Sequence, residues 1–176
     1  MIVNLSEIVT IKSGIYQNEQ PDGNAIYLQV NDFSNLELSY NQLKATVFIE
    51  GKSSDHLLRK DDLLFAAKGT SNFCVKYPSN IGNAVASSAF FVIRVINQEV
   101  LPDFLAWFLN LPRTLAYLQS QSVGSVIPSI TKKMLENLSL NVPDIATQQK
   151  IVEFSSLQQK EIKLYKQIAQ KRQIFL

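Results

Sequence analysis

The sequence has little of what disulfide-bonded, metal-binding or membrane proteins require. Its 176 residues include one cysteine and one histidine. A single thiol, Cys74, excludes an intrachain disulfide and a thiolate metal cluster, and we expect it to be a small buried core residue. No run reaches the roughly 20 apolar residues of a membrane span, and the first residues lack the layout of a signal peptide. These absences predict a cytoplasmic protein.

Sequence motifs for nucleotide chemistry are also missing. There is no GxxxxGK[ST] phosphate loop and no GxGxxG, and Lys68-Gly69-Thr70 is only a weak echo of the former. The Asn-Pro-Pro-aromatic motif of adenine N6-methyltransferases is absent as well. We therefore expect no ATP hydrolysis, no bound cofactor and no methyl transfer by this chain itself.

Candidate catalytic side chains are few and scattered. His56 lies in the polar stretch 51–56, which indicates a loop in which a histidine is solvated or locally hydrogen-bonded. Neighbouring strand residues point to opposite faces, so Asp61 and Asp62 would not share a site. A metal site would need more ligands than this neighbourhood offers. The sequence favours a protein that is not an enzyme; a small hydrolase using His56 or Asp61 stays as the alternative.

The composition predicts a folded domain with unevenly distributed charge. Hydrophobic residues make up 46% and charged residues 18%, with ten Phe, which is enough apolar surface for a core. The first 146 residues carry 11 bases and 13 acids, whereas the rest carry six bases and two acids. Because phosphates are bound mainly by Lys and Arg, any face that binds a polyanion must be a local patch.

Several segments have the composition of strands. Residues 25–30 are β-branched and aromatic, and the polar cluster 31–35 should end that strand. Residues 62–67 and 73–77 flank a Gly-containing loop and predict a hairpin. Residues 88–96 are apolar with little alternation, which predicts a central strand. Before them, residues 5–11 predict a short helix capped by Asn4 or Ser6, leading to a turn at Ser13-Gly14.

The second half favours short helices. One begins at 101–103, with Leu105, Trp107, Phe108 and Leu111 on its apolar side, and is interrupted by Pro112. A second, 113–121, is expected to turn Leu115, Tyr117 and Leu118 toward the core. Thr131 can cap a third over 132–137, and 138–142 alternates as an edge strand.

From Asp144 to the end there is no Gly or Pro, which predicts one helix of about 30 residues and about 45 Å. Its apolar positions form an imperfect heptad, which requires a partner surface, either its own domain or another chain. The predicted fold class is therefore α+β: a β-rich domain with short helices over 1–143, then one long coiled-coil-like helix over 144–176. The residues expected to face a partner helix are Ile151, Phe154, Gln158, Ile162, Tyr165 and Ile168.

Taken in order, these segments resemble the specificity subunit of type I restriction-modification systems. The matching segments are 5–14, Tyr27-Leu28-Gln29-Val30-Asn31-Asp32, Leu58 to Gly69 with its Asp-Leu-Leu-Phe phrase, the helix from Leu101 to Asn110, the closing segment from Gly124 to Thr131 with Leu135, Leu138 and Leu140, and Val142-Pro143 followed by Gln148-Gln149-Lys150-Ile151. The phrase at 58–69 is the most specific local match. The joint order over about 150 residues, more than any one motif, carries the resemblance.

The resemblance implies a non-catalytic role. Such a subunit recognises double-stranded DNA, its long helix docks methyltransferase subunits, and these link it to the restriction subunit. Full specificity subunits carry two recognition domains and two spacer helices, whereas this chain has one of each. We therefore expect half a subunit, which either pairs with a copy of itself through the long helix and reads a palindromic bipartite site, or is a fragment.

Base edges in the major groove are read by side chains on loops or edges, while phosphate contacts hold the register. In the loop at 68–72, Gly permits close approach, Lys can meet phosphate and Asn can pair with adenine; an ordinary hairpin turn is the alternative. Gln29 and Asn31 can point to a groove, although ordinary strand-end hydrogen bonding is the favoured interpretation of both. A stand-alone DNA-binding regulatory module is the remaining alternative function. The candidate DNA contacts are Lys12, Ser13, Gln17, Lys44, Lys52, Lys68, Gly69, Thr70, Ser71, Asn72, Lys132 and Lys133.

Overall fold

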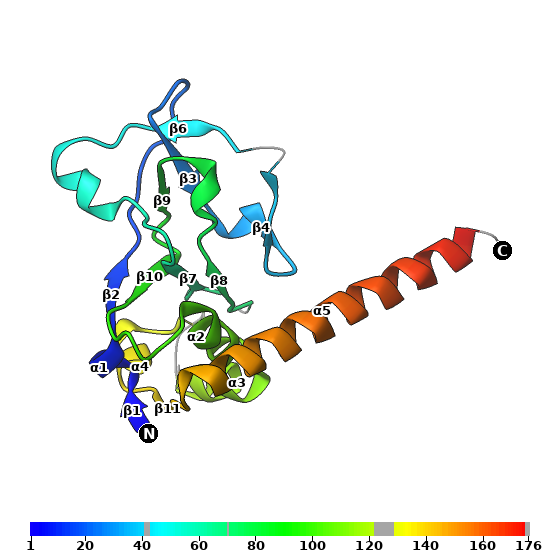
Figure 1. Cartoon of the computed structure of the whole chain (residues 1–176). Helices are drawn as coiled ribbons and strands as arrows, with labels where there is room; N and C mark the ends of the chain where they lie inside the picture. Colours follow the sequence, from blue (N-terminus) through cyan, green and yellow to red (C-terminus); the bar gives the residue numbers. More distant parts are fainter. Residues whose placement is uncertain (41–42, 70, 122–128, 175–176) are drawn as a thin grey trace.

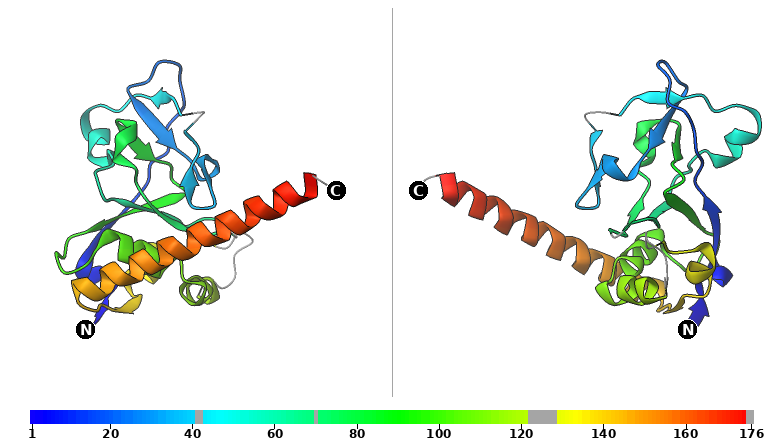
Figure 2. Two further views of the ribbon diagram at one scale, coloured as in Figure 1. Left: turned by 45° about the vertical axis from the view of Figure 1, so that its right-hand side comes forward. Right: turned by 180° about the vertical axis from the view of Figure 1, so that it is seen from behind.

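The computed structural model describes residues 1–40, 43–69, 71–121 and 129–174. It has the predicted α+β architecture: a head of three layers and one long helix, α5, that leaves the base of the head (Figure 1). A central antiparallel sheet forms the middle layer of the head. A second, smaller sheet lies on one face of the central sheet, and short helices lie on the other (Figure 2).

The central sheet contains β2 (Val9–Ser13), β10 (Phe90–Val95), β7 (Leu63–Ala66) and β8 (Cys74–Lys76), in the order β2-β10-β7-β8. β10 pairs with both β2 and β7, which confirms the prediction of a central strand. β7 and β8 form the predicted hairpin.

The central sheet has buried residues on both faces along β7 and β10. Along β7, Leu63 and Phe65 face the helices, whereas Leu64 and Ala66 face the smaller sheet, and all four are fully buried. β10 alternates in the same way at its buried positions, with Ile93 on the helical side and Phe90 on the other. Alternate side chains of one strand point to opposite faces, so these strands contribute to two cores at once. Their sequences are therefore largely apolar, with Arg94 as the exception in β10.

The smaller sheet has the order β6-β3-β9, with β3 (Ala25–Leu28) antiparallel to β6 (Ala45–Val47) and parallel to β9 (Ala84–Ala86). The strand predicted over 25–30 ends in a 3-10 turn, Val30–Asp32, followed by a hairpin of β4 (Phe33–Ser34) and β5 (Glu37–Leu38). Two more 3-10 segments, Gly51–His56 and Ser79–Ile81, complete this layer. The rings of Phe33, Phe73 and Phe90 meet with centroids 5.8–6.1 Å apart and join it to the central sheet.

The helical base contains α1 (Leu5–Ile8), α2 (Pro102–Leu109), α3 (Pro112–Ser120) and α4 (Lys132–Glu136), and the two-stranded pair of β1 (Ile2–Asn4) with β11 (Ser139–Asn141). The caps follow the predictions. Pro112 is the first residue of α3, and the Thr131 hydroxyl accepts a hydrogen bond of 3.2 Å from the Met134 amide.

Two positions in the base correct the predicted helix faces. Tyr117 was expected to face the core, but its side chain is 52% exposed. Phe104, which was not among the expected core residues, is fully buried beside Trp107. Of the other expected positions, Leu105 and Leu118 have no exposed surface, and Trp107, Phe108 and Leu115 pack partly buried against the same core.

The long helix α5 spans Ile145–Ile174, which confirms the predicted helix. The Asp144 carboxylate caps it by accepting hydrogen bonds from the amide and hydroxyl of Thr147, and these bonds lower the pKa of Asp144. Only its first turns are covered, with Ile151 and Val152 packed against the base. Beyond them the helix extends away from the base in every view (Figures 1 and 2).

Gln148 anchors this helix to the head. Its side chain has no exposed surface. Its Nε2 donates to the Glu99 and Pro143 carbonyls at 2.7 and 2.8 Å, and its Oε1 accepts from the Leu101 amide at 2.8 Å. One amide thereby satisfies three main-chain groups from two segments, which fixes where α5 begins.

Candidate nucleic-acid interface

The predicted contacts Lys12 and Ser13 lie at the end of β2, where the chain passes from the central sheet to the smaller one. Gly14 makes that passage: a Cβ there would lie 2.1 Å from the Ser87 carbonyl oxygen, so only glycine fits. Its amide donates to the Phe90 carbonyl at 2.9 Å. Lys12 and Ser13 are both exposed and hence accessible to a ligand.

A small hollow brings Lys12 together with Arg94 and His56, which were not among the predicted contacts, and with the carboxylate-bearing Asp55. Arg94 is held by Asp62, whose carboxylate has no exposed surface and accepts hydrogen bonds of 2.7 Å from both Nε and Nη2. The Arg59 amide donates to the same carboxylate at 2.8 Å. This pairing raises the pKa of Arg94, so its charge is permanent. No local pattern indicates this pair, because Asp62 and Arg94 are 32 residues apart in the chain.

The loop between β7 and β8 carries the largest group of predicted contacts. Lys68 and Ser71 are exposed, and Gly69 has φ of +93°, a left-handed conformation that favours glycine. Thr70 lies outside the described residues. The carbonyl of Ala67 accepts a hydrogen bond of 2.9 Å from the Ile130 amide, which ties the base of the loop to the segment before α4.

Asn72 has a different position from the one expected of a base-reading side chain. It is only 8% exposed, its Nδ2 donates to the Ala66 carbonyl, and its Oδ1 accepts from Gln119, both at 3.0 Å. Since both ends of the amide are hydrogen-bonded, Asn72 supports the loop from inside in this conformation. We therefore leave it out of the contact surface proposed below.

The remaining predicted contacts are distributed around the head. Lys44 lines a hollow of about 710 Å³ together with Glu19 and Asp22, so the charge there is mixed. Lys52 is exposed in the 3-10 segment that ends at His56, and Gln17 is half-buried. On α4, Lys132 pairs with Glu136 at 3.5 Å, whereas Lys133 is exposed.

Of the two strand-end residues, Gln29 forms the local hydrogen bonds that were predicted as the alternative to groove contact. The Gln29 side chain donates to Glu19 at 2.7 Å, and the Gln29 main-chain amide donates to the Asp32 carboxylate.

The twelve predicted contacts do not form one cluster. Lys12, Ser13 and the residues of the His56 hollow form one group, the exposed part of the β7–β8 loop a second, and Lys44 and the α4 lysines lie elsewhere.

Nothing in the described part of the chain resembles a catalytic constellation. The carboxylates of Asp61 and Asp62 face different cations, Lys76 and Arg94, as predicted for neighbouring residues that do not share a site. Cys74 is buried as expected, and burial raises the pKa of its thiol, which disfavours the nucleophilic thiolate. Among the described residues no group of three His, Cys, Asp or Glu could hold a metal. Within the same residues, no helix has the length and apolarity that a membrane crossing needs.

The predicted partner face of α5 is uncovered apart from Ile151. The exposed fractions of Phe154, Ile162, Tyr165 and Ile168 are 70%, 48%, 64% and 47%, and Gln158 is exposed beside them. In place of the expected partner helix, Ile151 packs against the base of its own head. Further along, Lys163 contacts both oxygens of Glu37 on the β4–β5 hairpin at 3.0 Å, above a hollow of about 380 Å³.

Comparisons with known proteins agree with the resemblance. The family model for the type I restriction modification DNA specificity domain matches residues 1–171. The type I restriction enzyme HindI specificity subunit of Haemophilus influenzae is 29% identical over 150 residues, which cover 84% of this chain and 32% of that protein. The chain therefore spans about a third of that relative.

Solved structures share the fold. A chain from a structural study of complex assembly and conformational transition in the type I R-M system matches with a TM-score of 0.69 and 18% identity, over 96% of this chain and 40% of that one. The HsdS subunit from Thermoanaerobacter tengcongensis gives 0.62 and 18%, over 96% and 39%. The S subunit of a type I system from M. genitalium gives 0.60 and 15%, over 95% and 41%. The matched coverage includes both the head and most or all of α5.

Proposed function

The chain belongs to the type I restriction-modification DNA specificity domain family, and from this membership we propose that it selects the DNA sequence on which partner adenine methyltransferase and nuclease subunits act. The observation that carries the proposal is the extent of the family match, which takes in the head and α5 together. The role is recognition without catalysis. The target bases are read by the head, and α5 sets the distance to a second recognition unit.

The surface that we assign to DNA runs from the end of β2 to the β7–β8 loop. It includes Lys12, Ser13 and Lys52 near the His56 hollow, and Lys68, Gly69 and Ser71 on the loop. Because acids outnumber bases in the first 146 residues, the attraction to phosphate must come from such a local group. Lys133 and Lys44 are proposed as outlying backbone contacts, together with Gln17 and Lys132.

The uncovered apolar face of α5 supports a second proposal, that two copies pair through this helix. Phe154, Ile162, Tyr165 and Ile168 form a row of exposed apolar side chains, of the kind that marks a protein interaction site. Two-fold pairing of antiparallel helices would place identical heads at opposite ends and require a palindromic bipartite site. The remaining helix surface is then available to the methyltransferase, which connects the assembly to the restriction subunit.

Selection from a random duplex library tests sequence recognition. The full chain, alone and together with its methyltransferase partner, is expected to enrich one short motif. An enriched pool identical to the input, or one fixed only in overall base composition, would contradict the proposal. In cells, deleting the gene should abolish one methylated motif from the genome and leave others unchanged.

Charge variants test the assigned surface. Lys12→Ala and Lys68→Ala should each reduce the slope of log Kd against log salt by roughly 0.9, the effect of losing one phosphate contact on duplex DNA. Lys60→Ala removes an exposed lysine outside the assigned surface and is the matched control. Equal slopes for all three variants and the parent would place the DNA on another face.

A further inference from the structure

The strand pair at the base of the head has an open edge on β11. Val142 and Met1 exchange two main-chain hydrogen bonds, at 2.8 and 2.9 Å, and the Leu5 amide donates to the Leu138 carbonyl at 2.9 Å. In an antiparallel pair, residues alternate between bonding to the partner strand and pointing away from it. The main-chain N–H and C=O groups of residues 138, 140 and 142 therefore point toward β1. Those of Ser139 and Asn141 point away from it. Among the described residues, no main-chain partner is found for these groups.

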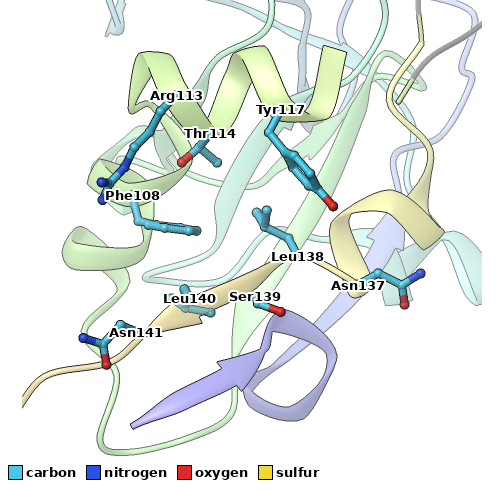
Figure 3. A pocket seen from close by; sticks show the side chains of 9 residues that line it. All are labelled: Phe108, Arg113, Thr114, Tyr117, Asn137, Leu138, Ser139, Leu140 and Asn141. Carbon is cyan, nitrogen blue, oxygen red and sulfur yellow. The ribbon is translucent and has the colours of Figure 1, made fainter. Parts of the chain in front are cut away.

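This edge lines a groove of about 420 Å³ between β11 and α3 (Figure 3). Thr114 and Tyr117 extend from α3 on one side, residues 137–141 form the other, and Phe108 and Leu140 lie between them. The volume is within the range of about 300–1,000 Å³ that ligand sites occupy. A strand edge facing a helix across an apolar floor is the arrangement in which proteins accept an added strand.

We propose that this groove binds an extended acidic segment of a partner protein, which adds to β11 as a further strand. Its main chain pairs with the N–H and C=O groups of Ser139 and Asn141. An apolar side chain of the segment rests on the half-buried ring of Phe108 and against the exposed ring of Tyr117.

The charge of the lining selects an acidic segment. Arg113 is exposed at the groove, and none of the described lining residues is Asp or Glu. A guanidinium binds a carboxylate through two parallel hydrogen bonds, which gives orientation as well as affinity. A peptide suits the edge better than nucleic acid, because phosphate oxygens offer no donors to the carbonyls of Ser139 and Asn141.

A phage library of random linear nonapeptides, panned against the full chain, tests the proposal. The double variant Arg113→Gln, Tyr117→Ala is the matched counter-bait, and because both side chains are exposed it is expected to fold. We expect enriched peptides that alternate apolar and other residues, carry Asp or Glu, and bind the variant at least tenfold more weakly, as loss of a charge-assisted bond predicts.

The binding mode is read from the enriched peptide by NMR of the ¹⁵N-labelled chain. The amides of Ser139 and Asn141 should shift and become protected from exchange, and N-methylating alternate residues of the peptide should abolish the effect. Three results would overturn the proposal: no enrichment over the counter-bait, equal binding of the N-methylated peptide, or a response of these amides to duplex DNA and not to peptide. DNA selection by the double variant should remain unchanged, so the outcome does not depend on the DNA-binding surface.

Discussion

The carboxylate of Asp62 occupies one of the most demanding positions in the head. It has no exposed surface, yet it accepts two hydrogen bonds from Arg94 and one from the Arg59 amide. A buried charge is tolerated only when it is paired and hydrogen-bonded. Asp62 therefore holds Arg94, which lines the hollow together with Lys12, in a defined position.

We predict that Asp62→Asn destabilises the fold by about 2–3 kcal/mol, because it leaves Arg94 without its counter-charge. The estimate is below the value for a fully buried pair, since the Arg94 side chain is 27% exposed. Urea unfolding followed by fluorescence measures it. Asp61→Asn is the control: the side chain is 46% exposed, its φ of +68° suits asparagine, and its effect should be about 0.5 kcal/mol or less.

The hydrogen-bond partners of Asp62 and Asn72 could not be predicted from the sequence. Asp62 was expected to begin a strand and lies immediately before β7, but its partner, Arg94 on β10, is 32 residues further along the chain. Asn72 was a candidate for pairing with adenine, with an ordinary hairpin turn as the alternative, and its amide is turned inward to Ala66 and Gln119. Composition locates a loop; only the tertiary contacts determine which of its side chains face out.

Local elements were predictable where one physical signal dominates. β10 is apolar on both faces, the β7–β8 loop contains Gly69, and α5 contains neither Gly nor Pro, and all three were predicted correctly. The prediction that Tyr117 faces the core was wrong, because the nine-residue helix α3 has several positions near the boundary of its buried face. The parallel pairing of β3 with β9 joins segments about 60 residues apart, and no local pattern indicates such a pairing.

The attachment of α5 depends on Gln148. We predict that Gln148→Ala destabilises the head by about 3 kcal/mol, because the Glu99 and Pro143 carbonyls and the Leu101 amide lose their buried partner. Urea unfolding gives the total effect. Hydrogen exchange should show faster opening of the first turns of α5.

Its neighbour Gln149 supplies the control. Gln149 is exposed, so Gln149→Ala should change stability by no more than about 0.5 kcal/mol. If both variants behaved alike, Gln148 would not be the anchor. The Gln-Gln-x-Ile phrase contributed to the family resemblance. In that case Ile151, which packs against the base, and not Gln148, would be the residue of this phrase that stabilises the fold.

For the assembly, we predict that the chain has twice the mass of one copy by light scattering at micromolar concentration. Ile162→Glu with Ile168→Glu should give the mass of one chain, because charge would be placed in the apolar face of α5. Gln167→Glu with Gln170→Glu adds the same charge on the opposite side of the helix and should leave the mass unchanged. A parent mass equal to one chain would count against self-pairing.

Salt should strengthen this pairing. From Thr147 onward each chain carries six bases and two acids, so two paired helices repel each other. Raising the ionic strength from about 0.05 to about 0.5 M screens that repulsion, and the dimer should dissociate at lower protein concentration. The opposite dependence would indicate that ion pairs, and not the apolar face, hold the copies together.

The double-sided burial of β7 and β10 has a consequence for how the head responds to stress. Neither neighbouring layer can separate from the central sheet without exposing one face of the shared strands to water, since Leu63 and Leu64 pack into different cores. Heating should therefore melt the head in a single calorimetric step. Residues at the tips of the loops that contact a target can therefore be substituted at little cost to stability, whereas the layers beneath them unfold as one cooperative unit.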